Sequence, residues 1–195
     1  PTTNLSVAAW VYLTGDGTHG NEHIASTEYN GKGWALRVDA ANLDDKGLRF
    51  TVHTQEGVLE PYLETKNYTT GWHLVTGTYD GQKASLYFDG IFVKSFSNNS
   101  PSPIVYEDNV NFIVGAKASL IETPTQFAYE SFRYMGIISG CEKTSYPNTY
   151  FQEKIDEVIV WDKPLSGLEV SSLYHNGADI LYETDTTPPA LPSLT

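Results

Sequence analysis

The segment Lys154–Gly177 constrains the fold more than any other part of the chain, because it joins an alternating strand to a capped helix. In Ile155–Trp161, side chains two residues apart share a face, which places Asp156 beside Val158 and Val160. The two valines predict that this face is mostly buried, and a buried carboxylate without a partner costs several kcal/mol. We therefore expect Asp156 to have a partner, which can be a bound cation, backbone N–H groups or a tyrosine hydroxyl.

The residues after this strand predict one short helix. Ser166 and Glu169 have the spacing of a capping box, in which each side chain accepts a hydrogen bond from the backbone N–H of the other residue. Gly177 stands where the helix would end. No other segment predicts a helix as convincingly.

Short segments with strand patterns make up most of the remaining chain. The dipeptides Asn30–Gly31, Asp80–Gly81 and Asp89–Gly90 lie between such segments and favour the positive backbone angles of tight hairpin turns. Many short strands, hairpin turns and one helix predict an all-β fold, an antiparallel β-sandwich of the jelly-roll type. The expected strands are Leu5–Leu13, His23–Glu28, Trp34–Val38, Leu48–Thr54, Trp72–Tyr79, Lys83–Phe88, Ile91–Phe96, Val110–Val114 and Ile155–Trp161.

Three segments resemble laminin-G-like jelly rolls of the concanavalin A-like lectin/glucanase superfamily. An early strand is matched by Leu5–Leu13, a central hairpin pair by Gly71–Gly90, and the closing strand and helix by IDEVIVWDKPLS and LEVSSLY. The resemblance implies a fold that hosts lectins, carbohydrate-binding modules, adhesion domains and some glycanases. It also implies a structural calcium ion held by Asp156 and by carbonyl oxygens of turns such as Asn30–Gly31.

Length and composition predict one globular domain. The 195 residues suffice for a single core, and 40% of them are hydrophobic. We expect a jelly roll at 1–183, which includes a long aromatic insert at 115–153 with an extra strand or hairpin near Phe132–Ile138. The threonine- and proline-rich segment 184–195 predicts a linker to a following module. These features favour an exported, multidomain bacterial protein, located extracellularly or at the cell surface.

Charge and motifs exclude several function classes. A formal net charge of −12 argues against nucleic acid and anionic membranes as partners, and no apolar run approaches the ~20 residues of a membrane span, so we expect no membrane insertion. Glycanases of this superfamily carry their two carboxylates in a Glu-x-Asp-x-Glu strand pattern, which no expected strand contains. We therefore predict that the protein is not an enzyme.

Carbohydrate recognition is the function that these observations favour. Sugars present apolar faces that stack on aromatic rings, and hydroxyl groups that pair with planar polar side chains. The fork of an arginine could hold a pair of hydroxyls or the carboxylate of a uronic acid. The candidate sugar-binding residues are Tyr29, Arg37, Tyr62, Tyr129, Arg133, Tyr134 and Tyr146.

We therefore predict a non-catalytic, lectin-like module with a structural calcium ion. Its expected partners are a glycan or glycoprotein and neighbouring domains of the same chain. Two alternatives stay open. The aromatic insert also fits a protein-interaction or spacer domain of a surface adhesin, because aromatic, methionine and arginine side chains are enriched at protein interfaces. The other alternative is a glycan-cleaving enzyme of the same superfamily.

Overall fold

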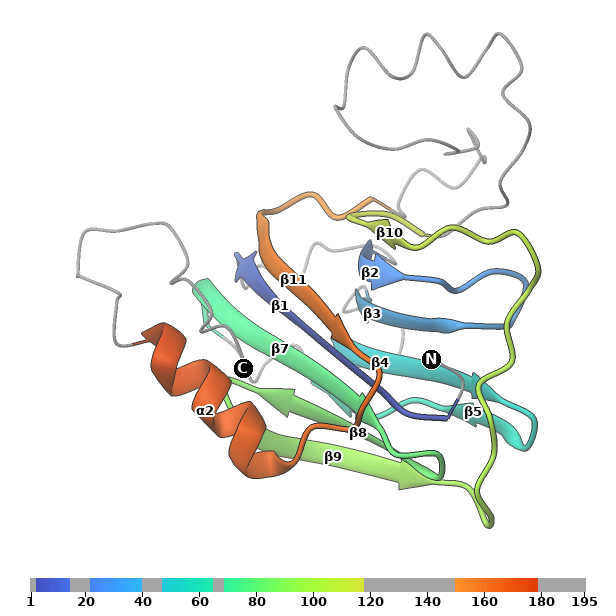
Figure 1. The fold of residues 1–195 in the computed structure, drawn as a ribbon. Coiled ribbons are helices and arrows are strands. Elements are labelled where there is room, and N and C mark those ends of the chain that lie inside the picture. The colour runs from blue at the N-terminus through green and yellow to red at the C-terminus, as the bar shows by residue number, and fades with distance from the viewer. Residues whose placement is uncertain (1–2, 15–21, 40–46, 65–68, 118–149, 179–195) are drawn as a thin grey trace, which may run out of the picture.

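The computed structural model of the chain describes residues 3–14, 22–39, 47–64, 69–117 and 150–178. Two antiparallel sheets pack face to face, and one helix lies against the outside of the first sheet (Figure 1). This architecture confirms the predicted antiparallel β-sandwich. Within the described residues, no helix is long and apolar enough to span a bilayer.

The two sheets, named A and B here, contain strands that are far apart in the sequence. Sheet A has the order β11 (Ile155–Trp161), β1 (Leu5–Leu13), β7 (Gly71–Tyr79), β8 (Lys83–Phe88) and β9 (Ile91–Ser97). Sheet B has the order β10 (Ile113–Val114), β2 (Glu22–Ser26), β3 (Trp34–Val38), β4 (Leu48–Thr54) and β5 (Gly57–Leu59), and β6 (Tyr62–Leu63) also pairs with β4.

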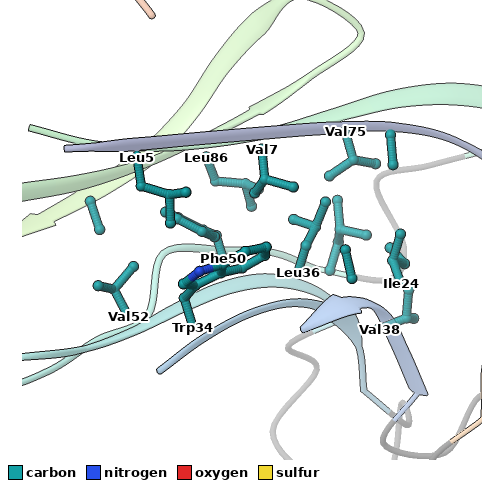
Figure 2. Close-up of a cluster of buried hydrophobic side chains, with 14 of the residues drawn as sticks. Leu5, Val7, Ile24, Trp34, Leu36, Val38, Phe50, Val52, Val75 and Leu86 are labelled. Carbon is teal, nitrogen blue, oxygen red and sulfur yellow. The ribbon is translucent and has the colours of Figure 1, made fainter. Parts of the chain in front are cut away.

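Alternating side chains of both sheets fill the space between them. Leu5 and Val7 of β1 point toward Leu36 of β3 and Phe50 of β4, and all four side chains are fully buried (Figure 2). This is the packing that the period of two along each strand predicts, because the facing positions are the apolar ones.

The opposite face of β1 is covered by helix α2 (Gly167–Ala178). Trp10 is fully buried there and stacks on Tyr174 with ring centroids 5.9 Å apart. The predicted capping box begins this helix: the Ser166 N–H donates to Glu169 Oε2 at 2.7 Å, and the Glu169 N–H donates to Ser166 Oγ at 3.3 Å. The helix ends one residue beyond the expected stop at Gly177.

Several expected strand bounds need correction. Strand β2 is Glu22–Ser26 and not His23–Glu28, and β7 and β9 each extend one residue beyond the expected Trp72–Tyr79 and Ile91–Phe96. Strand β10 is shorter than the predicted Val110–Val114, since only two of those residues pair with β2. Strands β5 and β6 were not predicted, because three-residue and two-residue strands carry too little alternation to detect. The expected hairpin near Phe132–Ile138 and the linker at 184–195 lie outside the described residues.

A β-bulge in β11 breaks the predicted alternation. Ala8 of β1 pairs with Ile159 and Trp10 pairs with Asp156, so two residues of β11 lie opposite one residue of β1. Glu157, one of these two residues, has a φ of 50°, and an extra residue of this kind changes which side chains share a face.

The bulge moves Asp156 away from the core. Ile155 and Val158 pack together against the core between the sheets, although they are three residues apart. Asp156 is exposed and Val160 is 38% exposed, so the expectation of a buried Asp156 was wrong. The Asp156 carboxylate accepts a hydrogen bond from the N–H of Glu157 at 2.8 Å.

A second feature, near the turn between β8 and β9, fixes the charge state of a buried histidine. His73 Nδ1 lies 2.8 Å from Asp89 Oδ2, and His73 Nε2 lies 2.9 Å from the carbonyl oxygen of Thr69. Both partners can only accept hydrogen bonds, so both ring nitrogens donate only in the protonated imidazolium. Burial opposes the charge, but the hydrogen bond and negative charge of Asp89, with the Thr69 carbonyl, raise the pKa of His73 above its ordinary 6.5.

Stability should respond to pH through His73. The folded-state pKa lies above the unfolded value, so the stabilising contribution is complete below about pH 6.5 and is lost as pH rises through the raised pKa. Urea unfolding should therefore show a loss of wild-type stability in this range that His73→Gln lacks. His175→Gln, on the exposed surface of the helix, should retain the wild-type profile. Parallel profiles for the wild type and His73→Gln would contradict the interpretation.

The close packing of Gly77 against Phe50 predicts that a larger side chain at position 77 destabilises the fold. A Cβ atom on Gly77 of β7 would lie 2.4 Å from ring carbons of Phe50, so Gly77→Ala should lower the free energy of unfolding by about 1–3 kcal/mol. Gly167→Ala is a matched control, because the added Cβ would meet Tyr87 at an ordinary 3.7 Å, and it should be neutral or slightly stabilising. Phe50→Leu should partly rescue Gly77→Ala in urea unfolding; equal effects of the two alanine variants would refute this packing.

Candidate functional site

A row of four polar or aromatic side chains crosses sheet B. The strand register places His23 opposite Arg37, Arg37 opposite Arg49, and Arg49 opposite Tyr62. Residues directly opposite each other project from the same face of a sheet. Because the residues adjacent to the two arginines in β3 and β4 fill the core, Arg37 and Arg49 lie on the outer face.

One carboxylate bridges the two arginines. Arg37 Nη2 donates to Glu60 Oε1 at 2.6 Å, and Arg49 Nη1 donates to Glu60 Oε2 at 2.9 Å. The hydroxyl of Thr51 also donates to Glu60 Oε1 at 3.0 Å. Like charges directly opposite each other destabilise a sheet, so Glu60 compensates for a repulsion that the register would otherwise create.

Two further carboxylates complete the arrangement, which we name the arginine–carboxylate network (Arg37, Arg49, Glu28, Asp39 and Glu60). Asp39 Oδ2 lies 2.7 Å from Arg49 Nε, and Glu28 Oε2 lies 3.9 Å from Arg37 Nη1. His53 Nε2 lies 3.7 Å from Glu28 Oε1. Two arginines and three carboxylates give the network a formal charge of −1 when His53 is neutral.

Burial strengthens these ion pairs. The arginine side chains are 12% and 10% exposed, whereas Glu60 reaches 26% and is the most accessible member. Burial alone would raise the pKa of Glu60, but the charges of Arg37 and Arg49 outweigh it and the pKa is lowered. The pKa of Glu28 falls to about 2 against the same burial penalty, owing to His53 and Arg37. Burial raises the pKa of Asp39 above its ordinary 3.8.

At one end of the row, His23 is fully buried. Burial lowers the pKa of His23 to about 3, so its imidazole is neutral at physiological pH. Neither ring nitrogen has a hydrogen-bond partner among the described residues.

At the other end, the Tyr62 ring carries Lys94 Nζ 3.5 Å from its centroid. This cation covers one face of the ring, so a sugar that stacks on that face would have to displace Lys94.

The structure places two of the predicted sugar-binding residues, Arg37 and Tyr62, in the same row of sheet B, on either side of Arg49. Tyr29 lies in the β2–β3 hairpin, where its N–H donates to the carbonyl oxygen of Lys32 at 3.0 Å. The other predicted residues, Tyr129, Arg133, Tyr134 and Tyr146, lie outside the described residues.

Sequence reasoning missed four members of the network, which are Arg49, Glu28, Asp39 and Glu60. A signal for one of them was present: Arg49 stands between Leu48 and Phe50, at the polar position of an alternating strand, as Arg37 does in β3. The acids carried no such signal, because their positions near the arginines depend on how four separate segments meet.

The calcium site expected at Asp156 and the Asn30–Gly31 turn stays a prediction. Ile155, which precedes Asp156, lies beside Gly115, and the Gly115 N–H donates to the carbonyl oxygen of Ile24. The Asn30–Gly31 turn lies in the hairpin between β2 and β3. In the part of the chain that is described, no three His, Cys, Asp or Glu residues are grouped to hold a metal ion.

The bridging role of Glu60 predicts a stability effect. Glu60→Gln removes the charge that separates Arg37 from Arg49, so the free energy of unfolding should fall by about 2 kcal/mol. Asp108→Asn removes the same charge from an exposed turn and should change stability by less than about 0.5 kcal/mol. Urea unfolding at neutral pH measures both values, and equal values for the two variants would show that Glu60 is not a structural bridge.

Comparisons with known proteins agree with this architecture. A laminin G family model, described as concanavalin A-like lectin/glucanases superfamily, matches residues 1–137. A search of curated proteins found no match.

Solved structures share the fold at low sequence identity. The binding domain of botulinum neurotoxin serotype G has a TM-score of 0.56 at 18% identity, over 90% of this chain and 38% of the toxin domain. A Bacteroides ovatus structure described as a "putative carbohydrate binding protein" has a TM-score of 0.56 at 16% identity, over 88% of this chain and 41% of that chain. A heptameric SAP-like pentraxin from Limulus polyphemus has a TM-score of 0.51 at 14% identity, over 89% of this chain and 70% of the pentraxin. The chain thus spans about two fifths of the first two structures.

Proposed function

Because the chain belongs to the concanavalin A-like lectin/glucanases superfamily, we propose that it is a non-catalytic carbohydrate-binding module. The single observation that carries the proposal is the arginine–carboxylate network on the outer face of sheet B. Arginine and carboxylate groups are planar, and their fixed donors and acceptors match pairs of sugar hydroxyls. Ion pairs hold these groups in place before a ligand arrives, which lowers the entropic cost of binding.

The accessible end of the network is where a sugar would bind. Glu60 is its most exposed member. Tyr62 of strand β6 pairs with Arg49, and Lys94 lies over the Tyr62 ring. A hydroxyl group can donate to a Glu60 oxygen, while a neighbouring hydroxyl accepts from an arginine N–H. The similarity to a structure described as a putative carbohydrate binding protein supports the same class of ligand.

The state of the carboxylates favours binding over catalysis. Glycoside hydrolysis needs a carboxylic acid that holds a proton near neutral pH, which requires a raised pKa. The pKa of Glu60 is lowered by Arg37 and Arg49, and that of Glu28 is lowered by a hydrogen bond with His53 and by the charge of Arg37. The pKa of Asp39 is raised by burial, but its carboxylate pairs with Arg49 Nε at 2.7 Å and is only 12% exposed, so it is poorly placed to protonate a glycosidic oxygen.

The wider setting follows from the same proposal. A glycan or glycoprotein is the partner, and the domain acts extracellularly or at the cell surface as part of a modular chain. The proposed binding needs no calcium, because the guanidinium and carboxylate groups of the network would contact the sugar directly. Calcium binding at Asp156 stays a prediction from the family resemblance, and binding assays with calcium and with a chelator separate the two ideas.

A glycan array at physiological ionic strength tests the proposal. The wild type should bind a defined set of glycans, and Arg37→Lys should weaken that binding at least tenfold, because lysine keeps the charge and loses the planar fork. Lys83→Arg, in β8 of the other sheet, is the matched control and should bind normally. Circular dichroism confirms that both variants fold. An empty array for the wild type, with and without calcium, would overturn the proposal.

A further inference from the structure

Glu60 occupies the position in which the carboxylate of an acidic sugar would bind. Its two oxygens are divided between the two arginines, at 2.6 Å from Arg37 Nη2 and 2.9 Å from Arg49 Nη1. Carboxylate–guanidinium pairing of this kind is the interaction by which an arginine would recognise a uronic acid. The protein therefore supplies, from its own chain, the group that an acidic ligand would contribute.

An acidic ligand would have to compete with this internal carboxylate. The backbone next to Glu60 is fixed to β4, because the carbonyl oxygen of Pro61 accepts a hydrogen bond from the Phe50 N–H at 3.0 Å. Glu60 is therefore held close to the two arginines. A tethered group has an effective concentration of millimolar or more, whereas a free ligand loses translational and rotational freedom when it binds. The hydroxyl of Thr51 further stabilises the internal arrangement by donating a hydrogen bond to Glu60 Oε1.

The negative charge of the protein also disfavours an acidic ligand. The network has a formal charge of −1, and the whole chain has a formal net charge of −12. An anionic ligand would therefore approach against a repulsive field and enter a site whose cations are already compensated. A neutral hydroxyl carries no such penalty and can pair with the remaining acceptor positions of Glu60.

We infer that the site selects uncharged, hydroxyl-bearing glycans and discriminates against uronic acids and sulfated sugars. This inference rests on the proposed carbohydrate-binding function and specifies its ligand class. It replaces the alternative in which the fork of Arg37 holds a uronic acid carboxylate.

Pairs of glycans that differ only in charge test the inference. Polygalacturonate and its fully methyl-esterified form are one such pair, and an array extends the comparison to other neutral and acidic oligosaccharides. At physiological ionic strength, the wild type should bind its neutral ligands at least tenfold more tightly than their acidic counterparts. If acidic members bind equally well or better, the inference fails while the proposed function stands. If no glycan of either kind binds, both fail.

A charge variant adds a direct test of mechanism. Glu60→Gln frees donors of Arg37 and Arg49 and changes the network charge from −1 to 0, so the ratio of acidic to neutral affinity should rise at least tenfold. Asp108→Asn removes one charge from an exposed turn and should leave the ratio within twofold of the wild type. An unchanged ratio in a folded Glu60→Gln protein would overturn the inference. If that variant does not fold, the wild-type ratio decides alone.

Discussion

Burial of β1 on both of its faces is the constraint on which the rest of the structure depends. One face supplies Leu5 and Val7 to the core between the sheets, and the other supplies Ala8 and Trp10 to the contact with α2. The strand also has neighbours on both sides, β11 and β7. A strand in this position must be apolar at nearly every residue, which accounts for the continuous hydrophobic run that β1 shows.

Much of the fold follows from local sequence patterns, and the exceptions have physical causes. Strands β3 and β8 have the predicted bounds, because each combines alternation with a clear turn signal at one end, and β1 has them because its apolar run stops at Leu13. The bulge at Glu157 could not be predicted, since an inserted residue becomes visible only when β11 is paired with β1. The sequence therefore predicted strand β11 and mispredicted which of its residues face the core.

The candidate site shows a similar division. Arg37 and Tyr62 were identifiable by residue type, because guanidinium groups and aromatic rings are groups that proteins use to bind sugars. Their positions in one row were not predictable, because they depend on the register of strands β3, β4 and β6, and β6 has only two residues. The role of Glu60 is a tertiary property as well: a single acid satisfies two arginines that the register places opposite each other. Burying such a network costs solvation energy that hydrophobic residues would not cost, and Glu60 offsets part of that cost by pairing with both arginines.

The late position of β11 in the chain, far from its partner strand β1, has a consequence for how the protein is made. Ser6 in β1 pairs with Trp161 in β11, 155 positions later, so one edge of the first strand stays without its partner until most of the described residues have been synthesised. At roughly 5–20 residues per second, this interval lasts about 8–30 s. The nascent domain therefore exposes a long apolar strand edge during translation, which is the surface that chaperones recognise and that aggregation exploits.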